Sequence, residues 1–315
     1  MQTYLEFERP YADLQTRISE LRVSAEAGDA DINSELEKLE VKAERILADT
    51  YAKLTPWQKT QVARHPSRPH FKHFTSRMVE DFTPLAGDRA FADDQAILGG
   101  LARFRGRKVM VIGHEKGDDT ASRIKHNFGM GKPEGYRKAI RLVELADRFN
   151  LPVVTLVDTS GAFPGIQAEE RGQAEAIARS TEACLNLGVP MVAAIVGEGG
   201  SGGAIALAAG NRVLMMANAV YSVISPEGCA SILWRTNEKA ADAAEAMKMT
   251  ADDLLALRVI DAVVPEPLGG AHRSPDVAID LLADAVEAAL ESLDGLSRDE
   301  LRADRRRKFL AMGAL

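Results

Sequence analysis

The glycine-rich stretch GEGGSGGA at residues 197–204 concentrates the residue types of this chain that are best suited to chemistry. It follows the apolar run MVAAIV at 191–196 and leads into the small-residue run AIALAAG at 204–210. Five glycines within eight residues carry a large cost in backbone entropy. Such a cost indicates a backbone that must turn tightly or approach another group closely.

The spacing of these glycines matches the dinucleotide-binding fingerprint G-x-G-x-x-G at Gly197, Gly199 and Gly202. That fingerprint lies between a strand and a long helix, and it is followed about twenty residues later by an acidic residue that binds the ribose. Here the helix expected over 201–209 is short, and the later segment ANAVYSV at 217–223 contains no carboxylate. The dinucleotide-binding interpretation is therefore disfavoured.

The same stretch also matches the nucleophile elbow G-x-S-x-G at Gly199, Ser201 and Gly203. Asp261 and His272 follow in the order that a hydrolase triad requires. This alternative stays open, although we expect His272 to lie in a surface loop, because its surroundings PLGGAHRSP are rich in turn-forming residues.

Two further signatures are excluded by what they lack. The sequence DTSG at 158–161 resembles the catalytic loop of aspartic proteases, but those enzymes need two such loops and this chain has one. A P-loop is excluded because no Lys-Ser or Lys-Thr pair follows the glycines.

A third interpretation of the glycine stretch uses backbone groups instead of side chains. Glycines between a strand and a helix expose adjacent N–H groups at a helix N-terminus, and the missing Cβ atoms let a carbonyl oxygen approach. Such an arrangement is an oxyanion hole, which suits a thioester enolate or a urea oxygen. The alternative is that the glycines only permit a tightly packed turn.

Alternating strands and helices place this stretch in an α/β protein. The expected strands have nearly continuous apolar character, which is typical of a parallel sheet that is buried on both faces. The segment TSGAFPG at 159–165 follows one of these strands, so it should line the same crevice as the glycine stretch. We expect strands over 107–113, 152–158, 190–196, 212–216 and 220–224, and helices over 133–149, 168–188 and 201–209.

Three regions are expected along the chain: a helical N-terminal region over 1–85, a core over 86–273 and a C-terminal helical segment over 274–315. In the first region, the apolar residues at helical spacing predict two antiparallel helices, which are joined by 24–31; the residues are Leu14, Ile18, Leu21, Ile32, Leu36, Leu39, Ala43 and Ile46.

Two polar segments flank the expected core. The segment RHPSRPHFKHF at 64–74 is interpreted as a basic surface loop and not as a metal site, because its histidines lack acidic or thiol co-ligands. After a helix over 275–295, the segment RADRRRKF at 302–309 is interpreted as a solvated basic tail.

Several polar residues near the strand ends have ordinary structural interpretations. We expect Asp158 to cap a turn, His114 and Lys116 to lie in a surface turn, and Glu227 to cap a helix. Glu198 either holds the glycine loop or is solvated. The apolar residues Ile232, Leu233 and Trp234 belong either to the core or to a subunit interface.

The overall composition excludes some classes of partner. A formal net charge of -7 argues against general binding to nucleic acid or to an anionic membrane. The apolar runs are too short to span a membrane, and the first residues contain no signal-peptide core. Cys184 and Cys229 are interpreted as buried thiols in a reducing compartment, so we expect a cytoplasmic protein.

The residues after the glycine stretch resemble a known family. The continuation GNRVLMMANAVYSVISPEG at 210–228 resembles the core of the crotonase superfamily. The chain also resembles, over essentially its whole length, the alpha subunits of bacterial acetyl-CoA carboxylase carboxyltransferase, on the segments 126–142, 158–179, 221–234 and 259–273. The resemblance implies a crotonase-like repeated ββα superhelix with a helical N-terminal extension.

The resemblance also implies a reaction and its partners. The family moves a carboxyl group from carboxybiotin to acetyl-CoA and so forms malonyl-CoA for fatty acid biosynthesis. Biotin is then attached to a biotin carboxyl carrier protein and not to this chain, and no metal is expected in this chain. The implied partners are a beta subunit in an α2β2 tetramer, the carrier protein and the biotin carboxylase of an ATP-dependent holoenzyme.

The resemblance assigns roles to the glycines. The amides of Gly202 and Gly203 would bind the ureido oxygen of departing biotin, while the thioester enolate would be stabilised by the beta subunit. Departing biotin would take the methyl proton itself, so no general base is expected in this chain. The expected substrate-binding residues are Gly161, Ala162, Phe163, Gly165, Gly199 and Gly200.

The chain departs from the pattern Asp-Thr-Pro-Gly-Ala-Tyr-Pro-Gly of the family at two positions. Ser160 replaces the proline, and Phe163 replaces the tyrosine. Because Phe163 has no hydroxyl group, it is expected to form a wall of the site. The specificity for acyl groups beyond acetyl-CoA is expected to depend on the partner.

Overall fold

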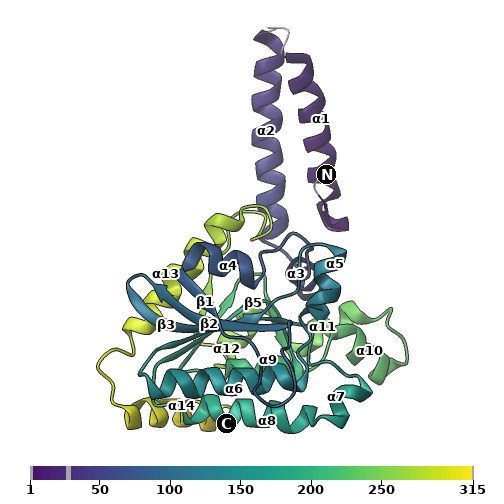
Figure 1. The fold of residues 1–315 in the computed structure, drawn as a ribbon. Helices are drawn as coiled ribbons and strands as arrows, with labels where there is room; N and C mark the ends of the chain where they lie inside the picture. The colour runs from purple at the N-terminus through teal and green to yellow at the C-terminus, as the bar shows by residue number, and fades with distance from the viewer. Residues whose placement is uncertain (1–2, 26–29, 314–315) are drawn as a thin grey trace.

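The core of the protein is a mixed β-sheet, seen in the computed structural model that describes residues 3–25 and 30–313 (Figure 1). The strand order is β1-β2-β3-β4-β5-β6-β8, and β7 pairs with β5. β1, β2 and β3 are antiparallel, whereas the remaining pairings are parallel. The strands are β1 (Glu80–Pro84), β2 (Ile97–Phe104), β3 (Arg107–His114), β4 (Val153–Thr159), β5 (Met191–Gly200), β6 (Arg212–Met216), β7 (Val220–Ser222) and β8 (Ala262–Val264).

The central strands are covered on both faces. Every residue of β4 and β5 is buried, which explains their nearly continuous apolar sequences. Figure 1 shows α6, α8 and α14 below the sheet and α4 and α13 above it. The α/β class expected from the sequence is therefore confirmed. These covering helices are α4 (Phe71–Met78), α6 (Pro133–Arg148), α8 (Gln173–Asn186), α13 (Pro275–Glu291) and α14 (Arg298–Ala311).

Shorter helices connect the strands or lie at the edges of the sheet. Two of them, α9 and α10, border the glycine stretch. The shorter helices are η1 (Glu6–Glu8), α3 (Pro56–Ala63), α5 (Thr120–Lys125), η2 (Asn127–Gly129), α7 (Ile166–Glu170), α9 (Ser201–Ala208), α10 (Pro226–Trp234), α11 (Ala240–Met247) and α12 (Ala251–Ala256).

The first two long helices form an antiparallel pair that projects from the body of the protein (Figure 1). They are α1 (Arg9–Ala25) and α2 (Ala30–Tyr51), and the pair confirms the expectation from the apolar spacing. Ile18, Leu36 and Ala43 form the buried seam between them. Residues 26–29 of the expected connection and the side chain of Ile32 lie outside the described residues.

A buried carboxylate attaches the base of this helical pair to the body. Glu8 accepts hydrogen bonds from Arg273 at 2.6 Å and from the Tyr51 hydroxyl at 2.8 Å. The Arg273 guanidinium also lies over the Tyr11 ring, 4.7 Å from its centroid. Ionic and aromatic contacts therefore anchor the end of the pair that lies next to the body.

The basic segment near the C-terminus is not a solvated tail. It forms α14, and Arg305 within it is fully buried. Arg305 donates hydrogen bonds to the carbonyls of Cys184 and Val189, at 2.8 and 2.9 Å, and to Asn211. The prediction of a solvated tail was wrong because the guanidinium of Arg305 donates to backbone carbonyls at the end of α8 instead of to water.

Other differences concern element boundaries. The helix expected over 168–188 is divided into α7 and α8, because Gly172 adopts a φ of +77° between them. β1, β2 and β8 were not expected from the sequence. None of the helices within 3–25 and 30–313 is both long enough and apolar enough to cross a membrane.

Candidate active site

A bulge in β5 determines the position of the glycine stretch 197–204 relative to the neighbouring strands. β4 advances from Val157 to Thr159 while its partner β5 advances from Ile195 to Gly199, so β5 holds extra residues between these pairs. Before the bulge β5 pairs with β6, and after it β5 pairs with β7. The bulge therefore changes the partner of β5 from β6 to β7 just before the glycine turn, while Gly199 stays paired with Thr159 of β4.

The turn after β5 presents the first amides of α9. Gly200 precedes the helix with no side-chain cap, and Ser201 adopts a φ of +51°. Gly202 and Gly203 lie in the first turn, where backbone N–H groups have no acceptor four residues earlier in the helix. Their N–H groups and the helix dipole favour an anionic group at this point.

The two glycines differ in the space around them. A Cβ atom on Gly203 would lie 2.8 Å from both the Ala162 nitrogen and the Gly161 carbonyl carbon. A Cβ atom on Gly202 would come no closer than 3.4 Å to Ile177. Gly203 is therefore required for the close packing of two loops, whereas Gly202 is not.

A cavity of about 670 Å³ opens beside this turn. It brings Gly161, Ala162 and Gly202 together, three of the residues that the sequence analysis selected. The cavity is lined by Arg64, Ser160, Gly161, Ala162, Ile177, Ser201, Gly202, Val223, Ile224, Ser225 and Glu227.

The remaining selected residues pack around the two loops. Gly203 is buried against the Gly161 loop, and Gly199 and Gly200 are buried within β5. A Cβ atom on Gly200 would overlap with the Ser160 carbonyl, and one on Gly165 would overlap with the ring of Phe163.

Phe163 is half-buried, and its backbone nitrogen donates to the Gly131 carbonyl at 3.0 Å. The ammonium group of Lys132 lies 5.6 Å from the centroid of its ring. Direct contact of substrate with Phe163, Gly165, Gly199 and Gly200 stays a prediction.

Asp158, at the end of β4, is fully buried at the centre of a polar cluster. Its carboxylate lies 2.7 Å from the Lys116 ammonium and 3.1 Å from the Nδ1 atom of His70, and it accepts from the Glu198 backbone nitrogen at 2.9 Å. Burial alone would raise the pKa of Asp158, but Lys116 and the hydrogen bonds offset this and leave the pKa well below its usual range. Asp158 therefore links β4 to Lys116 after β3 and to the backbone of β5, and it does not cap a local turn.

The expected surface turn after β3 is also buried. His114 is 1% exposed, and neither ring nitrogen has a hydrogen-bond partner among the described residues. Burial lowers the pKa of His114 to about 4. Lys116 is mostly enclosed by Asp158 and Glu198, which raise its pKa despite burial. The prediction of a surface turn was wrong because this turn lies under the segment that begins at residue 64.

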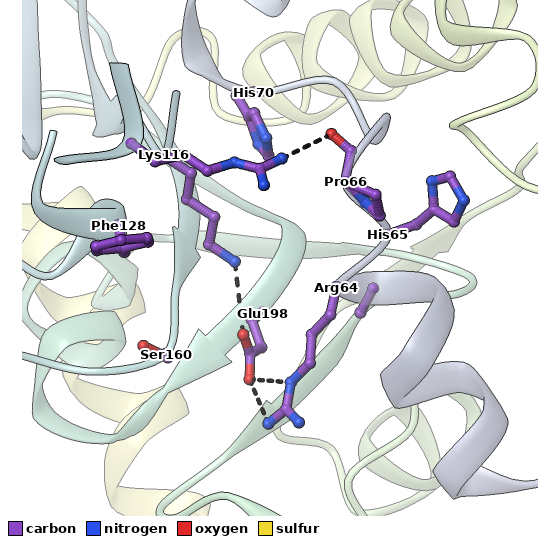
Figure 2. A pocket seen from close by; sticks show the side chains of 10 residues that line it. Arg64, His65, Pro66, His70, Lys116, Phe128, Ser160 and Glu198 are labelled. Atoms are coloured by element: carbon purple, nitrogen blue, oxygen red, sulfur yellow. Dashed lines mark hydrogen bonds and ion pairs between the residues drawn. The ribbon is translucent and has the colours of Figure 1, made fainter. Parts of the chain in front are cut away.

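Arg64 joins the cluster to the rim of the cavity. Figure 2 shows Lys116, Glu198 and Arg64 in a row, and the guanidinium of Arg64 lies 2.7 Å from Glu198 and 2.5 Å from Glu227. Glu227 does not cap α10, because the Ser225 hydroxyl accepts the hydrogen bond from the Gly228 nitrogen. A second cavity of about 270 Å³ lies behind Arg64, and the two cavities share Arg64 and Ser160.

The segment 64–74 is not a surface loop. Phe71 and Phe74 are buried in the core, and Arg68 is 1% exposed. Arg68 donates to the Val196 carbonyl at 2.7 Å and pairs with Glu266. The segment therefore lies over the end of β5, and its Arg68 donates a hydrogen bond to a backbone carbonyl at the bulge.

This polar cluster was not predicted as a unit from the sequence. One signal could have indicated it: Lys116, Asp158 and Glu198 each lie at or just after the carboxyl end of one of three neighbouring parallel strands. In α/β sheets these ends meet at one edge, where ligands bind.

The alternative triad is not assembled. The ring of His272 stacks on His65 at 3.9 Å, and neither nitrogen of His272 has a hydrogen-bond partner in the described part of the chain. Burial lowers the pKa of His272 to about 3. Asp261 binds Lys308 and the Val213 nitrogen. Ser201 therefore has no positioned base, and His272 is enclosed instead of lying in a surface loop.

No group of three or more potential metal ligands among His, Cys, Asp and Glu occurs within the ranges 3–25 and 30–313. The three histidines of the segment 64–74 make other contacts. His65 stacks on His272, and His70 binds Asp158. The Nδ1 atom of His73 accepts a hydrogen bond from the backbone nitrogen of His70 at 3.2 Å.

Comparison with known sequences gives a match over nearly the whole chain. The family model described as acetyl co-enzyme A carboxylase carboxyltransferase-like matches residues 4–313. The chain is 73% identical over 313 residues to a protein of Rhizorhabdus wittichii, covering 99% of this chain and 100% of that protein. It is 71% identical to a protein of Sphingopyxis alaskensis, covering 99% of each. Both are named acetyl-coenzyme A carboxylase carboxyl transferase subunit alpha.

Comparison with solved structures identifies the fold. A transcarboxylase 12S matches with a TM-score of 0.55 and 21% identity, over 69% of this chain and 42% of that one. A Pseudomonas malonate decarboxylase chain matches with a TM-score of 0.56 and 18% identity, over 69% of this chain and 88% of that one. These neighbours have the crotonase fold, so the expected fold class is confirmed.

Proposed function

The chain belongs to the acetyl co-enzyme A carboxylase carboxyltransferase-like family, and from this premise we propose that it is the alpha subunit of an acetyl-CoA carboxylase carboxyl transferase. The enzyme moves a carboxyl group from carboxybiotin to acetyl-CoA, and the product is malonyl-CoA for fatty acid biosynthesis. The two proteins described above carry this name, and they align with 99% of the chain at 73% and 71% identity.

The observation that carries the proposed chemistry is the glycine turn at the cavity. The N–H groups of Gly202 and Gly203 lie in the first turn of α9, and Gly202 lines a cavity of about 670 Å³. When biotin is bound in its carboxylated form, it supplies the carboxyl group that is transferred. The two amides then donate to the ureido oxygen on which negative charge develops, and one such donor contributes roughly 3 kcal/mol to the transition state.

The chain holds these amides in place before substrate arrives. The close contact of Gly203 with the Gly161–Ala162 backbone fixes the distance between the two loops, so the donors need not reorganise during the reaction. Departing biotin would take the methyl proton itself, so the proposed reaction needs no side chain of this cluster as a general base.

We further propose that a beta subunit completes the site and stabilises the thioester enolate. The rim of the cavity supports this proposal, because Val223 lines the cavity and is 82% exposed. On the adjoining helix α10, Ile232 is 72% exposed and Leu233 is 63% exposed. Exposed apolar groups that adjoin a cavity are typical of a protein interface.

The wider assembly is proposed from the family. It comprises an α2β2 tetramer, a biotin carboxyl carrier protein and a biotin carboxylase, working together in the cytoplasm. Cys184 and Cys229 are both free thiols, which is compatible with a reducing compartment.

Reconstitution tests the proposed function. The purified chain alone is expected to be inactive, and addition of the beta subunit is expected to restore the biotin-dependent decarboxylation of malonyl-CoA, measured with free biotin. Activity of the isolated chain would overturn the proposal. A parallel assay with acetyl-CoA and propionyl-CoA in the reconstituted complex measures the acyl specificity.

A further inference from the structure

The bulge of β5 leaves backbone groups that the sheet does not satisfy. The Glu198 nitrogen donates to Asp158 Oδ1 at 2.9 Å, and the Val196 carbonyl accepts from Arg68 Nε at 2.7 Å. Buried backbone groups without such partners are strongly destabilising. Side chains from other elements therefore keep the bulge in its observed form.

Two buried ion pairs supply these side chains. Arg68 and Glu266 are 0% and 1% exposed, and Arg68 binds the Val196 carbonyl. Lys116 and Asp158 are 16% and 2% exposed, and Asp158 binds the Glu198 nitrogen. A buried carboxylate needs a compensating cation, because the loss of one partner leaves an uncompensated charge.

Lys116 connects the ends of three neighbouring strands. It follows β3, its ammonium lies 2.7 Å from Asp158 on β4, and it lies 3.5 Å from Glu198 on β5. Figure 2 shows its side chain extended toward Glu198. No other lysine or arginine is within ion-pairing distance of Asp158 among the described residues.

Asp158 and Glu198 each immediately precede one of the two loops at the active site. The loops 159–163 and 199–203 contact each other where Gly203 packs on Ala162. Gly197 allows the approach of Asp158, since a Cβ atom on Gly197 would overlap with the carboxylate. A shift of Asp158 would therefore move both loops, and with them the amides of α9.

We propose that Lys116 is a positioning residue for carboxyl transfer: by neutralising Asp158 and holding Glu198, it fixes the β5 bulge that aims the amides of Gly202 and Gly203. The proposal rests on the proposed function, because it concerns the same site. Lys116 acts through Asp158 and Glu198 and does not contact the reacting atoms.

The test uses Lys116→Met in the reconstituted complex of full-length subunits, with the exposed Lys53→Met as the matched control. Misplacement of the amides by about 1 Å is expected to lower kcat roughly 100-fold. KM for malonyl-CoA is expected to change by less than about twofold, because Lys116 contributes to turnover and not to acyl-CoA binding.

Hydrogen exchange of the backbone gives a readout that does not depend on activity. In Lys116→Met, peptides that cover 196–203 are expected to exchange faster, because the Asp158 carboxylate no longer holds the Glu198 nitrogen firmly. Peptides from α13 and from β2 are expected to be unchanged. Unchanged exchange over 196–203 would overturn the proposal, whatever the activity.

A compensating variant separates positioning from general damage. In Lys116→Met/Asp158→Asn the uncompensated charge is removed, and the amide oxygen of the new side chain can still accept from the Glu198 nitrogen. We expect slower exchange and at least about tenfold higher kcat than in Lys116→Met alone. A double variant as slow as the single one would overturn the proposal.

The wild-type complex distinguishes the two proposals. If wild-type chain and beta subunit together show no carboxyl transfer, the proposed function fails, while the exchange measurements still decide the role of Lys116. If the wild-type complex is active and Lys116→Met retains wild-type kcat, the positioning proposal alone is overturned.

Discussion

At the scale of single residues, Gly202 and Gly203 are neighbours in α9 with different tolerance for a side chain. Gly203 packs on backbone atoms of the 159–163 loop, which cannot move without moving β4. Gly202 faces the cavity and the flexible side chain of Ile177. Ser201 is exposed between β5 and Gly202, and no hydrogen bond joins its hydroxyl to Asp261 or to His272 in the described part of the chain.

We therefore predict that Gly203→Val lowers carboxyl transfer by at least about 100-fold, because it separates the loops that hold the amides. Gly202→Ala and Ser201→Ala should keep most of the activity, since both retain the backbone N–H groups. Malonyl-CoA decarboxylation by the reconstituted complex measures the effect, and gel filtration checks assembly. A Ser201→Ala variant as slow as Gly203→Val would instead assign the chemistry to the serine hydroxyl.

At the scale of elements, the buried Arg305 is one of the residues that attach α14 to the rest of the molecule. Arg305 donates to two carbonyls at the end of α8 and to the Val189 carbonyl before β5. Burial lowers the pKa of Arg305 to about 10, so the group remains charged at neutral pH. The C-terminal helix α14 is thus attached to the layer formed by α6 and α8 through hydrogen bonds as well as through apolar packing.

Arg305→Leu is expected to lower the free energy of unfolding by roughly 3 kcal/mol, because the carbonyls of Cys184, Leu185 and Val189 lose the hydrogen bonds from Arg305. The matched control is Arg307→Leu, on the same helix, where the side chain is 79% exposed. Urea unfolding followed by circular dichroism measures both variants. Equal stability of the two variants would contradict this role of Arg305 and would show that water replaces its hydrogen bonds to the carbonyls.

At the scale of the whole molecule, buried carboxylates join parts that are distant in the sequence. Glu8 fixes the N-terminal helices to Arg273, and Glu266 fixes Arg68 at the β5 bulge. Burial would raise the pKa of Glu8 and of Glu266, but hydrogen bonds and the partner arginines more than offset it. Both pKa values are therefore lowered in the folded protein.

This lowering predicts that the protein loses stability in acid. A carboxyl group with a lower pKa in the folded state stabilises the fold fully above its unfolded pKa, which for Glu is ordinarily 4.5. The stabilisation is lost as the pH falls below that value toward the folded-state pKa. Unfolding by urea from neutral pH down to about pH 3 should show this loss.

The variants Glu8→Gln and Glu266→Gln should be less stable at neutral pH and show a weaker dependence on pH below 4.5 than the wild type. The exposed Glu37→Gln serves as the control and should follow the wild-type curve. A wild-type pH profile in either buried variant would contradict the role assigned to that carboxylate.

Much of the fold is predictable because it depends on local patterns. The strands around 107–113, 152–158 and 190–196 have continuous apolar sequences, and the structure confirms them. β2 was missed because its sequence ILGGLARF contains adjacent glycines, which disfavour a strand. β8, with the three residues Ala262–Val264, was also missed.

The sequence by itself determined the family, the α/β class and the glycine turn, because these depend on motifs and on short-range apolar spacing. Only the tertiary structure decided which charges meet. His70 and Asp158 are 88 positions apart, and Arg68 and Val196 are 128 positions apart. From the neighbouring sequence alone, a charged residue is predicted to be exposed to solvent. Its burial becomes favourable only when folding brings a partner from a distant part of the sequence into contact with it.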